Sequence, residues 1–326
     1  MPKPVVVRTD RINPYQNLAL EECILDSIGE DAIVLFLWQS ARAVVIGRNQ
    51  NVWQECDVRL LEREKILLAR RISGGGTVWH DAGNLNFSFI ASRGLYDAGR
   101  QMRLILSALS SLGFSGSSAG NNILSPDGRK VSGSAFTQRR NGSLHHGTLL
   151  INADIGDLVR CLNVPQNTLS GKAVPSVRSH VCNISEFIGG ISIKDVADAL
   201  IKSFGAEYGP PSYDHAVNES RLNELCRRNA SWEWIYGRSP RFGARFDARF
   251  PWGSIELLLS VSNGVVDEAE VYSGATNESA VRSLALALKG AHFSSSALSE
   301  RAAKLAKETG SDIIKDIAGW LSTLNI

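Results

Sequence analysis

The sequence lacks several features that would place a protein in a common class. It has no run of about 18 apolar residues, so it offers no candidate transmembrane helix. Its 35 Lys and Arg residues nearly balance its 33 Asp and Glu residues, and the net charge of +2 gives no general attraction to nucleic acid or membranes. The five cysteines are scattered without a C-x-x-C pair, which is typical of reduced thiols in a reducing compartment.

The amino terminus has no apolar segment followed by a cleavage site. We therefore expect a soluble, cytoplasmic protein, or a mitochondrial-matrix protein if the source is eukaryotic and a presequence has been removed. We further expect a monomer that binds neither nucleic acid nor membranes.

The common nucleotide-binding motifs are missing as well. Gly74, Gly75 and Gly76 do not fit G-x-G-x-x-G. Gly171 and Lys172 lack the earlier glycine of a P-loop and are followed by Ala173. A dehydrogenase or P-loop protein is therefore not indicated, and no internal repeat or low-complexity segment is present.

What the chain does contain is an unusual segment at residues 70–89, RRISGGGTVWHDAGNLNFSF. Three adjacent glycines are costly in regular structure, so they indicate a positive φ or a ligand close to bare backbone N–H groups. Arg70 and Arg71 add planar cations suited to carboxylate or phosphate. We interpret the segment as an anion site; the alternative is a glycine-rich turn beside a solvated basic pair.

Periodicity predicts an α+β protein whose 326 residues allow about two domains. We expect strands at 5–8, 32–38, 43–47, 66–69, 85–90, 130–136, 144–151, 254–261 and 265–272. We expect helices at 17–28, 57–65, 96–112, 196–204, 219–228, 277–288, 297–308 and 312–324. The dipeptides Asn141-Gly142 and Asn263-Gly264 predict hairpin turns.

Two segments have no such periodicity. Residues 166–179 are polar and contain Gly and Pro, which predicts a loop long enough to move. Residues 231–250 are rich in aromatics and arginine, and we interpret them as a linker packed against a domain surface rather than a nucleic-acid site. The predicted domains are therefore a catalytic domain, residues 1–243, and a small accessory α+β domain, residues 244–326.

Four residues leave alternatives open. Glu21 and Glu22 lie in the first predicted helix, where carboxylates usually face solvent, although a pocket is the alternative. Trp38 ends a strand and suits either the core or a pocket wall. Lys130 begins a strand, which is normally a solvated edge position.

Five separated motifs resemble, in order and spacing, the lipoate protein ligase A family. They are VVIGRNQNVWQEC at 44–56, RRISGGGTVWHDAGNLNFSF at 70–89, GRKVSGSA at 128–135, HHGTLLINAD at 145–154 and SVRSHVCNISE at 176–186. The segment WEWIYGRSPRF at 232–242 resembles the two-domain bacterial form and the related lipoyltransferases. The resemblance covers essentially the whole chain.

The family implies a mixed-sheet catalytic domain of the biotin and lipoate protein ligase type, followed by a small α+β C-terminal domain. It also implies a two-step, ATP-dependent ligase reaction. Lipoate and MgATP give lipoyl-AMP, and a lysine of an apo-lipoyl domain then displaces AMP. The acceptors would be E2 subunits of 2-oxoacid dehydrogenases and the glycine cleavage H protein. The alternative is a lipoyltransferase that uses preformed lipoyl-AMP without efficient activation.

The resemblance also implies roles for individual residues. Lys130 would be the catalytic group, bridging the lipoyl carbonyl and the phosphate. The ATP and adenylate site would comprise Arg71, Gly76, Thr77, Val78, Trp79, Lys130, Ser176, Arg178 and Asn183. The lipoate site would comprise Leu18, Glu21, Trp38, Arg71, Ser73, Gly75, His80 and Lys130. No metal site formed by the protein is expected.

Some positions depart from the family pattern. An Arg-Asn-Asp run is usual where this chain has Asn121, Asn122 and Ile123. His180 and Cys182 stand where Arg and Thr are common. Octanoyltransferases of this fold use a cysteine nucleophile, but we interpret Cys182 as a packing residue. His80 is interpreted as a structural hydrogen-bonding residue, and the general base is left unassigned.

Overall fold

The computed structural model describes residues 2–162, 169–171, 180–213, 216–273 and 278–326. The chain forms two compact units. The first comprises Met1–Arg48, Ile66–Arg160 and Ser176–Ser231, and the second comprises Asn49–Lys65, Cys161–Pro175 and Trp232–Ile326. Among the described residues, no helix is both long enough and apolar enough to span a membrane.

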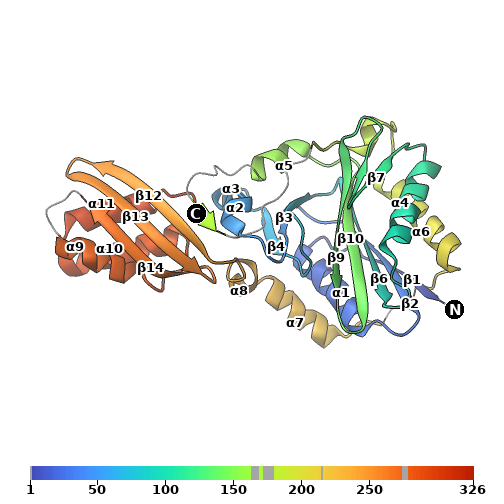
Figure 1. The fold of residues 1–326 in the computed structure, drawn as a ribbon, viewed down its shortest axis with the longest axis horizontal. Coiled ribbons are helices and arrows are strands. Elements are labelled where there is room, and N and C mark those ends of the chain that lie inside the picture. The colour runs from blue at the N-terminus through green and yellow to red at the C-terminus, as the bar shows by residue number, and fades with distance from the viewer. Residues whose placement is uncertain (1, 163–168, 172–179, 214–215, 274–277) are drawn as a thin grey trace. The chain divides into compact units, whose positions relative to one another are not determined.

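The first unit is built on a seven-stranded mixed sheet (Figure 1). Only β1 and β2 pair in parallel; all other neighbours are antiparallel. In spatial order the strands are β1 (Lys3–Arg8), β2 (Ala32–Trp38), β6 (Asn84–Ser92), β10 (Gly142–Leu150), β9 (Lys130–Gln138), β8 (Asn122–Leu124) and β7 (Ser117–Ala119).

The two faces of this sheet have different partners. Helices α4 (Ala98–Ser111) and α6 (Ile193–Tyr208) pack on one face, where Leu85, Phe87 and Phe89 join the apolar core. Helix α1 (Pro14–Ser27) packs on the other face, and α7 (Glu219–Asn229) packs on α1 (Figure 1). Since alternate residues of a strand face opposite sides, Asn84, Asn86 and Ser88 of β6 face α1.

A second sheet of the first unit carries the glycine segment. Its order is β4-β3-β5, with β3 (Ala43–Ile46) parallel to β4 (Leu67–Arg70) and antiparallel to β5 (Val78–His80). Residues 71–77 connect β4 to β5. Strand β5 was not predicted, because three residues directly after a glycine run give no periodicity. The unit is completed by α5 (Ile155–Cys161) and the 3₁₀ turn Ile184–Glu186.

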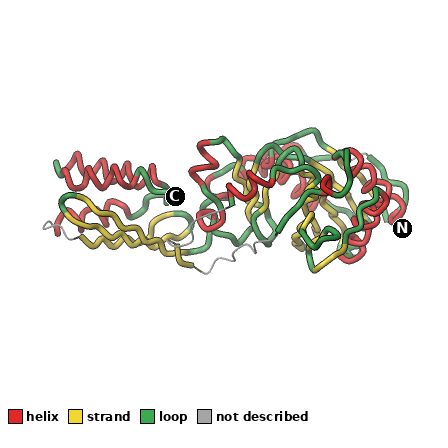
Figure 2. Tube along the Cα trace, turned by 90° about the horizontal axis from the view of Figure 1, so that it is seen from above, coloured by secondary structure: helices red, strands yellow, loops and turns green. Residues whose placement is uncertain are grey.

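The second unit has a four-stranded antiparallel sheet and three longer helices. The sheet order is β11 (Leu169–Gly171), β12 (Phe242–Phe250), β13 (Gly253–Ser262) and β14 (Val265–Ser273). The helices of this unit are α2 (Val52–Glu55), α3 (Val58–Arg63), α8 (Trp232–Ile235), α9 (Glu278–Leu288), α10 (Ser295–Thr309) and α11 (Asp312–Leu321). Figure 2 shows α9 to α11 layered along one face of the strands.

Most predicted elements are confirmed, and β2 has the predicted bounds. The turn at Asn263 and Gly264 is confirmed by φ values of 52° and 71°. The other hairpin is confirmed as well, but Gly142 already pairs with Ser92 in β10, so its turn falls at residues 139–141 rather than at Asn141-Gly142.

Three expectations need correction or stay open. The linker interpretation of residues 231–250 is wrong for residues 242–250, which form β12 between β11 and β13. Within the predicted loop 166–179, residues 169–171 form β11, and the others lie outside the described residues. The predicted domain boundary between residues 243 and 244 falls within β12, and its position stays a prediction.

Candidate active site

Gly75 lies in the segment that joins β4 to β5, at a position where both the backbone and a neighbouring side chain favour glycine. Its φ of 86° lies in the left-handed region, which glycine adopts at little cost. A Cβ at this position would lie 3.0 Å from Nη2 of Arg71. Glycine therefore fits both the backbone conformation and the neighbouring guanidinium, as expected for the glycine run.

The buried side chain of Arg71 donates hydrogen bonds to this segment. Its Nε donates to Oγ of Ser73 at 3.1 Å, and its Nη1 donates to the carbonyl oxygen of Val45 at 3.1 Å. Its Nη2 donates to the carbonyl oxygens of Gly74 and Gly76 at 2.7 Å each. Burial lowers the pKa of Arg71 to about 10, so the guanidinium is still charged at neutral pH.

Arg70 is buried as well, and its Nη1 donates to the carbonyl oxygens of Gly47 and Arg48 at 3.1 Å each. The alternative of a solvated basic pair is therefore wrong. The predicted contact of Arg71 with nucleotide phosphate stays a prediction, since its donors contact backbone carbonyl oxygens and the Ser73 hydroxyl in this structure.

A chain of buried hydrogen bonds runs from the glycine segment to α1. Oγ of Ser73 lies 2.6 Å from Nε2 of His146, and Nδ1 of His146 lies 2.9 Å from Oε2 of Glu21. The same carboxylate accepts from the Ser88 hydroxyl at 2.5 Å. These four side chains are buried, so the expectation that Glu21 faces solvent is wrong. That its carboxylate points into a ligand pocket stays a prediction.

His146 was not singled out from the sequence, although it lies in a quoted motif. Two adjacent histidines in a strand face opposite sides of its sheet. His145 accordingly packs against Phe87 and Phe136 on the core side, while His146 reaches Glu21. This alternation was the available signal.

Lys130 is the first residue of β9, and two backbone hydrogen bonds fix its position. Its N–H donates to the carbonyl oxygen of His180 at 2.8 Å, and its carbonyl oxygen accepts from Cys182 N–H at 3.0 Å. A Cβ on Gly133 would lie 2.7 Å from Nζ of Lys130, so the side chain folds over that glycine. The pKa of Lys130 is lowered by burial and by the positive charge of Arg71. The ammonium is thus partly buried rather than a solvated edge group.

The sheet face that packs against α1 carries four positions in register across four strands. Trp38 pairs with Asn86, Asn86 with Thr148, and Thr148 with Gly133. Directly opposed residues share one face of a sheet, so these positions form a row. The Lys130 ammonium marks one end of the row, and Trp38 lies three strand spacings away, about 14 Å.

Trp38 and His80 pack edge to face, with ring centroids 5.4 Å apart and an interplanar angle of 70°. Both are buried, as is Leu18 of α1. Burial, with smaller contributions from Arg71 and His146, lowers the pKa of His80 to about 3. His80 is therefore neutral at physiological pH and a poor general base. Its Nδ1 has no hydrogen-bond partner among the described residues, which does not support the structural interpretation made from the sequence.

The predicted phosphate-binding backbone from Gly76 to Trp79 leads into β5. The indole Nε1 of Trp79 donates to Oδ2 of Asp81 at 2.8 Å, and the Asp81 carboxylate also accepts from Gly83 N–H and Asp154 N–H. The Trp79 side chain is thus a structural anchor. Phosphate binding by the backbone of Gly76, Thr77, Val78 and Trp79 stays a prediction.

Asn183 makes two hydrogen bonds to the backbone of Ala153. Its Oδ1 accepts from Ala153 N–H, and its Nδ2 donates to the Ala153 carbonyl oxygen, both at 2.9 Å. A role of Asn183 in adenylate binding stays a prediction. Ser176 and Arg178, the other predicted adenylate contacts, lie outside the described residues.

The structure therefore brings together most of the predicted lipoate site and Lys130. Electrostatic interactions link Arg71 with Glu21, with His80 and with Lys130. Across the ranges that the structure describes, no three or more His, Cys, Asp or Glu side chains form a group that could hold a metal ion.

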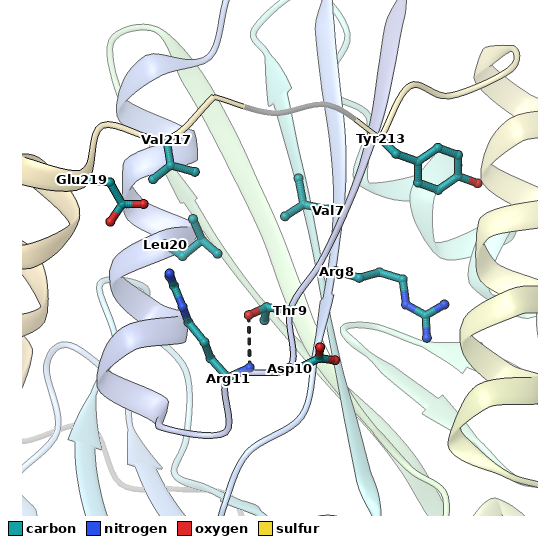
Figure 3. Close-up of a pocket in the computed structure, with 9 residues that line it drawn as sticks. All are labelled: Val7, Arg8, Thr9, Asp10, Arg11, Leu20, Tyr213, Val217 and Glu219. Atoms are coloured by element: carbon teal, nitrogen blue, oxygen red, sulfur yellow. Dashed lines mark hydrogen bonds between the residues drawn. The ribbon is translucent and has the colours of Figure 1, made fainter.

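An open cavity of about 630 Å³ lies elsewhere in the first unit (Figure 3). It holds none of the predicted site residues, and its cationic side chains come from β1 and the turn after it. The lining residues are Val7, Arg8, Thr9, Asp10, Arg11, Leu20, Tyr213, Val217 and Glu219.

Comparison with known proteins identifies the family of this chain. Residues 13–205 match the family model described as the lipoyl protein ligase A/B catalytic domain. The chain belongs to this family. Residues 239–321 match a second model, the bacterial lipoate protein ligase C-terminus. The resemblance seen in the sequence is thereby confirmed.

Solved structures are similar over most of the chain. P. falciparum LipL1 in complex with lipoate is 26% identical, with a TM-score of 0.64, and the match covers 98% of this chain and 100% of that chain. A bipartite lipoate protein ligase of Thermoplasma acidophilum, described with its E2 lipoyl domain, is 27% identical with a TM-score of 0.64 and covers 73% and 98%. A lipoate-protein ligase A bound with ATP is 25% identical with a TM-score of 0.58 and covers 73% and 99%.

These matches show a lipoate-protein-ligase fold, a mixed α+β catalytic unit followed by a lipoate protein ligase C-terminus, as the sequence predicted. They support a ligase enzyme, and the similar structures include complexes with lipoate and with ATP.

Proposed function

We propose that this protein attaches lipoate to a lysine of apo-lipoyl domains in two steps at one site. In the first step, a carboxylate oxygen of lipoate attacks the α-phosphorus of MgATP, forming lipoyl-AMP and releasing pyrophosphate. In the second step, the ε-amine of the acceptor lysine attacks the lipoyl carbonyl, and AMP leaves as the amide forms. Magnesium enters with the nucleotide, whose phosphates commonly carry it.

The observation that carries this proposal is the Lys130 ammonium. It is partly buried, no hydrogen-bond partner for it is present among the described residues, and it lies near a second buried cation, Arg71. Such an arrangement favours a bound anion, because an anion offsets the repulsion between the two cations. Both steps of the ligase reaction supply one: first the carboxylate and phosphate, then the oxyanion on the attacked carbonyl.

The second step places a specific demand on Lys130. Negative charge develops on the lipoyl carbonyl oxygen, and a fixed ammonium nearby stabilises that charge. Removing one such donor from an enzyme typically lowers the rate by ~10²- to 10³-fold. Arg71 and Ser73 hold the glycine segment whose backbone N–H groups would receive the nucleotide phosphates.

The acceptors we propose are lipoyl domains of 2-oxoacid dehydrogenase E2 subunits and the glycine cleavage H protein. The similar archaeal ligase, which was described with an E2 lipoyl domain, supports the first of these. The first experiment is intact-mass analysis of a recombinant apo-lipoyl domain after incubation with the protein, lipoate and MgATP, with ATP omitted as control. We expect an ATP-dependent gain of one lipoyl group.

The outcome also separates the ligase from a lipoyltransferase. A mass gain that requires preformed lipoyl-AMP, without pyrophosphate release from lipoate and ATP, would replace the ligase proposal by the transferase. No mass gain under either condition would reject both activities.

Lys130→Ala tests the assigned residue. We expect the variant to fold, since the side chain makes no hydrogen bond in the described structure, and to lose ~10²-fold or more of both half-reactions. Lys202→Ala, which removes an exposed lysine of α6, is the matched control and should retain normal turnover. Near-normal turnover of Lys130→Ala would reject the assignment.

The geometry gives no support to a thioester mechanism through Cys182. The thiol is buried, lies 3.6 Å from the Ser125 hydroxyl, and has its pKa raised by burial. Reactive cysteines have lowered pKa values and partial exposure. We therefore expect Cys182→Ala to remain active, which fits a packing residue beside Lys130.

A further inference from the structure

Two buried N–H donors lie unpaired at the end of the row opposite Lys130. Nε1 of Trp38 and Nδ2 of Asn86 have no hydrogen-bond partner in the part of the chain that the structure describes. The two side chains are only 4% and 2% exposed. A buried donor without a partner is destabilising, and native structures contain few of them. A ligand that supplies acceptors would remove this deficit.

The two side chains are neighbours on one face of the sheet. Trp38 and Asn86 are opposite each other in the β2–β6 register, so their side chains lie on the sheet face that packs against α1. Asn84 orients the amide, because its Nδ2 donates to Oδ1 of Asn86 at 3.0 Å. The acceptor end of the Asn86 amide is thus occupied, and its NH₂ group is left for another partner.

The length of the row fits the proposed substrate. Trp38 lies about 14 Å from the Gly133 end, where the Lys130 ammonium lies. An extended eight-carbon acid spans about 10 Å, given C–C bonds of about 1.5 Å. With its carboxylate beside Lys130, such an acid brings its far end to Trp38 and Asn86.

We infer that Trp38 and Asn86 select acids whose far end carries a sulfur ring over acids that end in a plain alkyl chain. This inference rests on the proposed function and specifies its substrate. Ring sulfur is a weak hydrogen-bond acceptor, and sulfur also makes favourable contacts with aromatic rings such as the indole. An alkyl end leaves both donors unpaired, whereas a dithiolane gives each of them an acceptor.

The test compares three acids of similar length: lipoate, octanoate and 5-cyclopentylpentanoate, whose ring has nearly the shape of the dithiolane but lacks sulfur. Dissociation constants from calorimetry and kcat/KM for ligation are measured for each acid. We expect the native protein to prefer lipoate over both others. Equal binding of lipoate and the cyclopentyl acid would overturn the inference, because shape alone would then explain selection.

Variants assign the preference to the two residues. We expect Asn86→Leu and Trp38→Phe each to reduce the ratio of lipoate to octanoate affinity about threefold to tenfold, as for loss of one modest hydrogen bond. Two variants are used so that a folding defect in one leaves the other informative. An unchanged ratio in the folded variants would overturn the inference.

Gln101→Leu is the matched control. Gln101 is a buried amide whose Nε2 also lacks a partner among the described residues, and its Oε1 is paired with Nδ1 of His145 at 2.9 Å. It lies in α4, on the opposite face of the sheet. We expect a comparable loss of stability but no change in the affinity ratio.

Failure of the inference and failure of the proposed function give different results. If all three acids are ligated with a ratio that the variants do not change, the inference is wrong and the ligase activity stands. If no acid is ligated but calorimetry shows the expected ratios, the donor pair is supported and the ligase proposal is wrong.

Discussion

Gly133 is constrained by the lysine three residues before it. Its φ is not positive, so other residues could adopt its backbone conformation. A Cβ there, however, would lie 2.7 Å from Nζ and 2.8 Å from Cε of Lys130. The glycine thus leaves the space in which the ammonium lies, and we interpret it as a positioning residue that acts through Lys130.

Gly133→Ala is expected to move the ammonium while leaving the fold intact, because the atoms it displaces are the end of a flexible side chain. A misplacement of about 1 Å can lower a rate ~10²-fold, so we expect kcat to fall by about that factor with little change in thermal stability. Gly94→Ala, at an exposed glycine with no atom within 4 Å of the new Cβ, is the control. Unchanged kcat in Gly133→Ala would contradict the positioning role.

At the scale of elements, α1 connects the site to the rest of the first unit through two adjacent carboxylates. Glu21 reaches His146 on the sheet, while Glu22 pairs with Arg139 at 2.8 Å and with Arg228 of α7. Consecutive helical residues point about 100° apart, so α1 can contact the sheet through one carboxylate and α7 through the other. The two arginines hold the pKa of Glu22 below its usual value against the effect of burial.

Glu22→Ala is expected to destabilise the protein by about 1.5–3 kcal/mol, as for loss of hydrogen bonds to a charged group, because two partly exposed arginines lose their buried counter-ion. Urea unfolding measures this change in the free energy of unfolding. Glu224→Ala removes an exposed carboxylate that pairs with Arg221 and should cost less than about 1 kcal/mol. Equal effects of the two substitutions would show that the Glu22 pairs add nothing beyond a surface interaction.

The same elements show what sequence can and cannot predict. Strong periodicity located β2, α4 and the hairpins, and the pattern of glycines and arginines located the segment at residues 70–89. The burial of Glu21 and Glu22 was missed because α1 is covered by the sheet on one side and by α7 on another. Those partners come from chain segments about 60 to 200 residues away, so no local pattern reports them.

The candidate site was predictable to the same extent. The glycine segment follows from local chemistry, whereas the role of Lys130 follows only from the family resemblance. His146 and Asn86 acquire their interest from strand register, which pairs Ser88 with His146 and Asn86 with Trp38. Register depends on how strands distant in sequence align, so neither residue was singled out. Strand β12 was missed because its many arginines and aromatics were interpreted as a linker. Its partner strands, β11 and β13, explain why these residues form a strand.

At the scale of the whole molecule, two buried histidines make stability depend on pH. Burial lowers the pKa of both His80 and His145 to about 3, with smaller contributions from neighbouring positive groups. In the unfolded chain a histidine binds a proton below about pH 6.5. Between these pKa values the unfolded state therefore holds more protons than the folded state, so the free energy of unfolding decreases as pH falls.

We expect the stability that depends on the two neutral histidines to be fully present above about pH 6.5 and to be lost towards pH 3. Each histidine adds a slope of about 1.4 kcal/mol per pH unit within the window, or about 2.7 for the pair. Urea unfolding at pH 7, 6 and 5 measures the slope where most carboxylates remain ionised.

His145→Leu provides the decisive comparison, because it removes one of the two titrating groups from the core and leaves the predicted site intact. We expect the slope between pH 6 and pH 5 to fall to about half that of the native protein, whatever the variant's absolute stability. A slope equal to the native one would mean that His145 is not held neutral by its surroundings. The acid sensitivity of the molecule would then have to come from other groups.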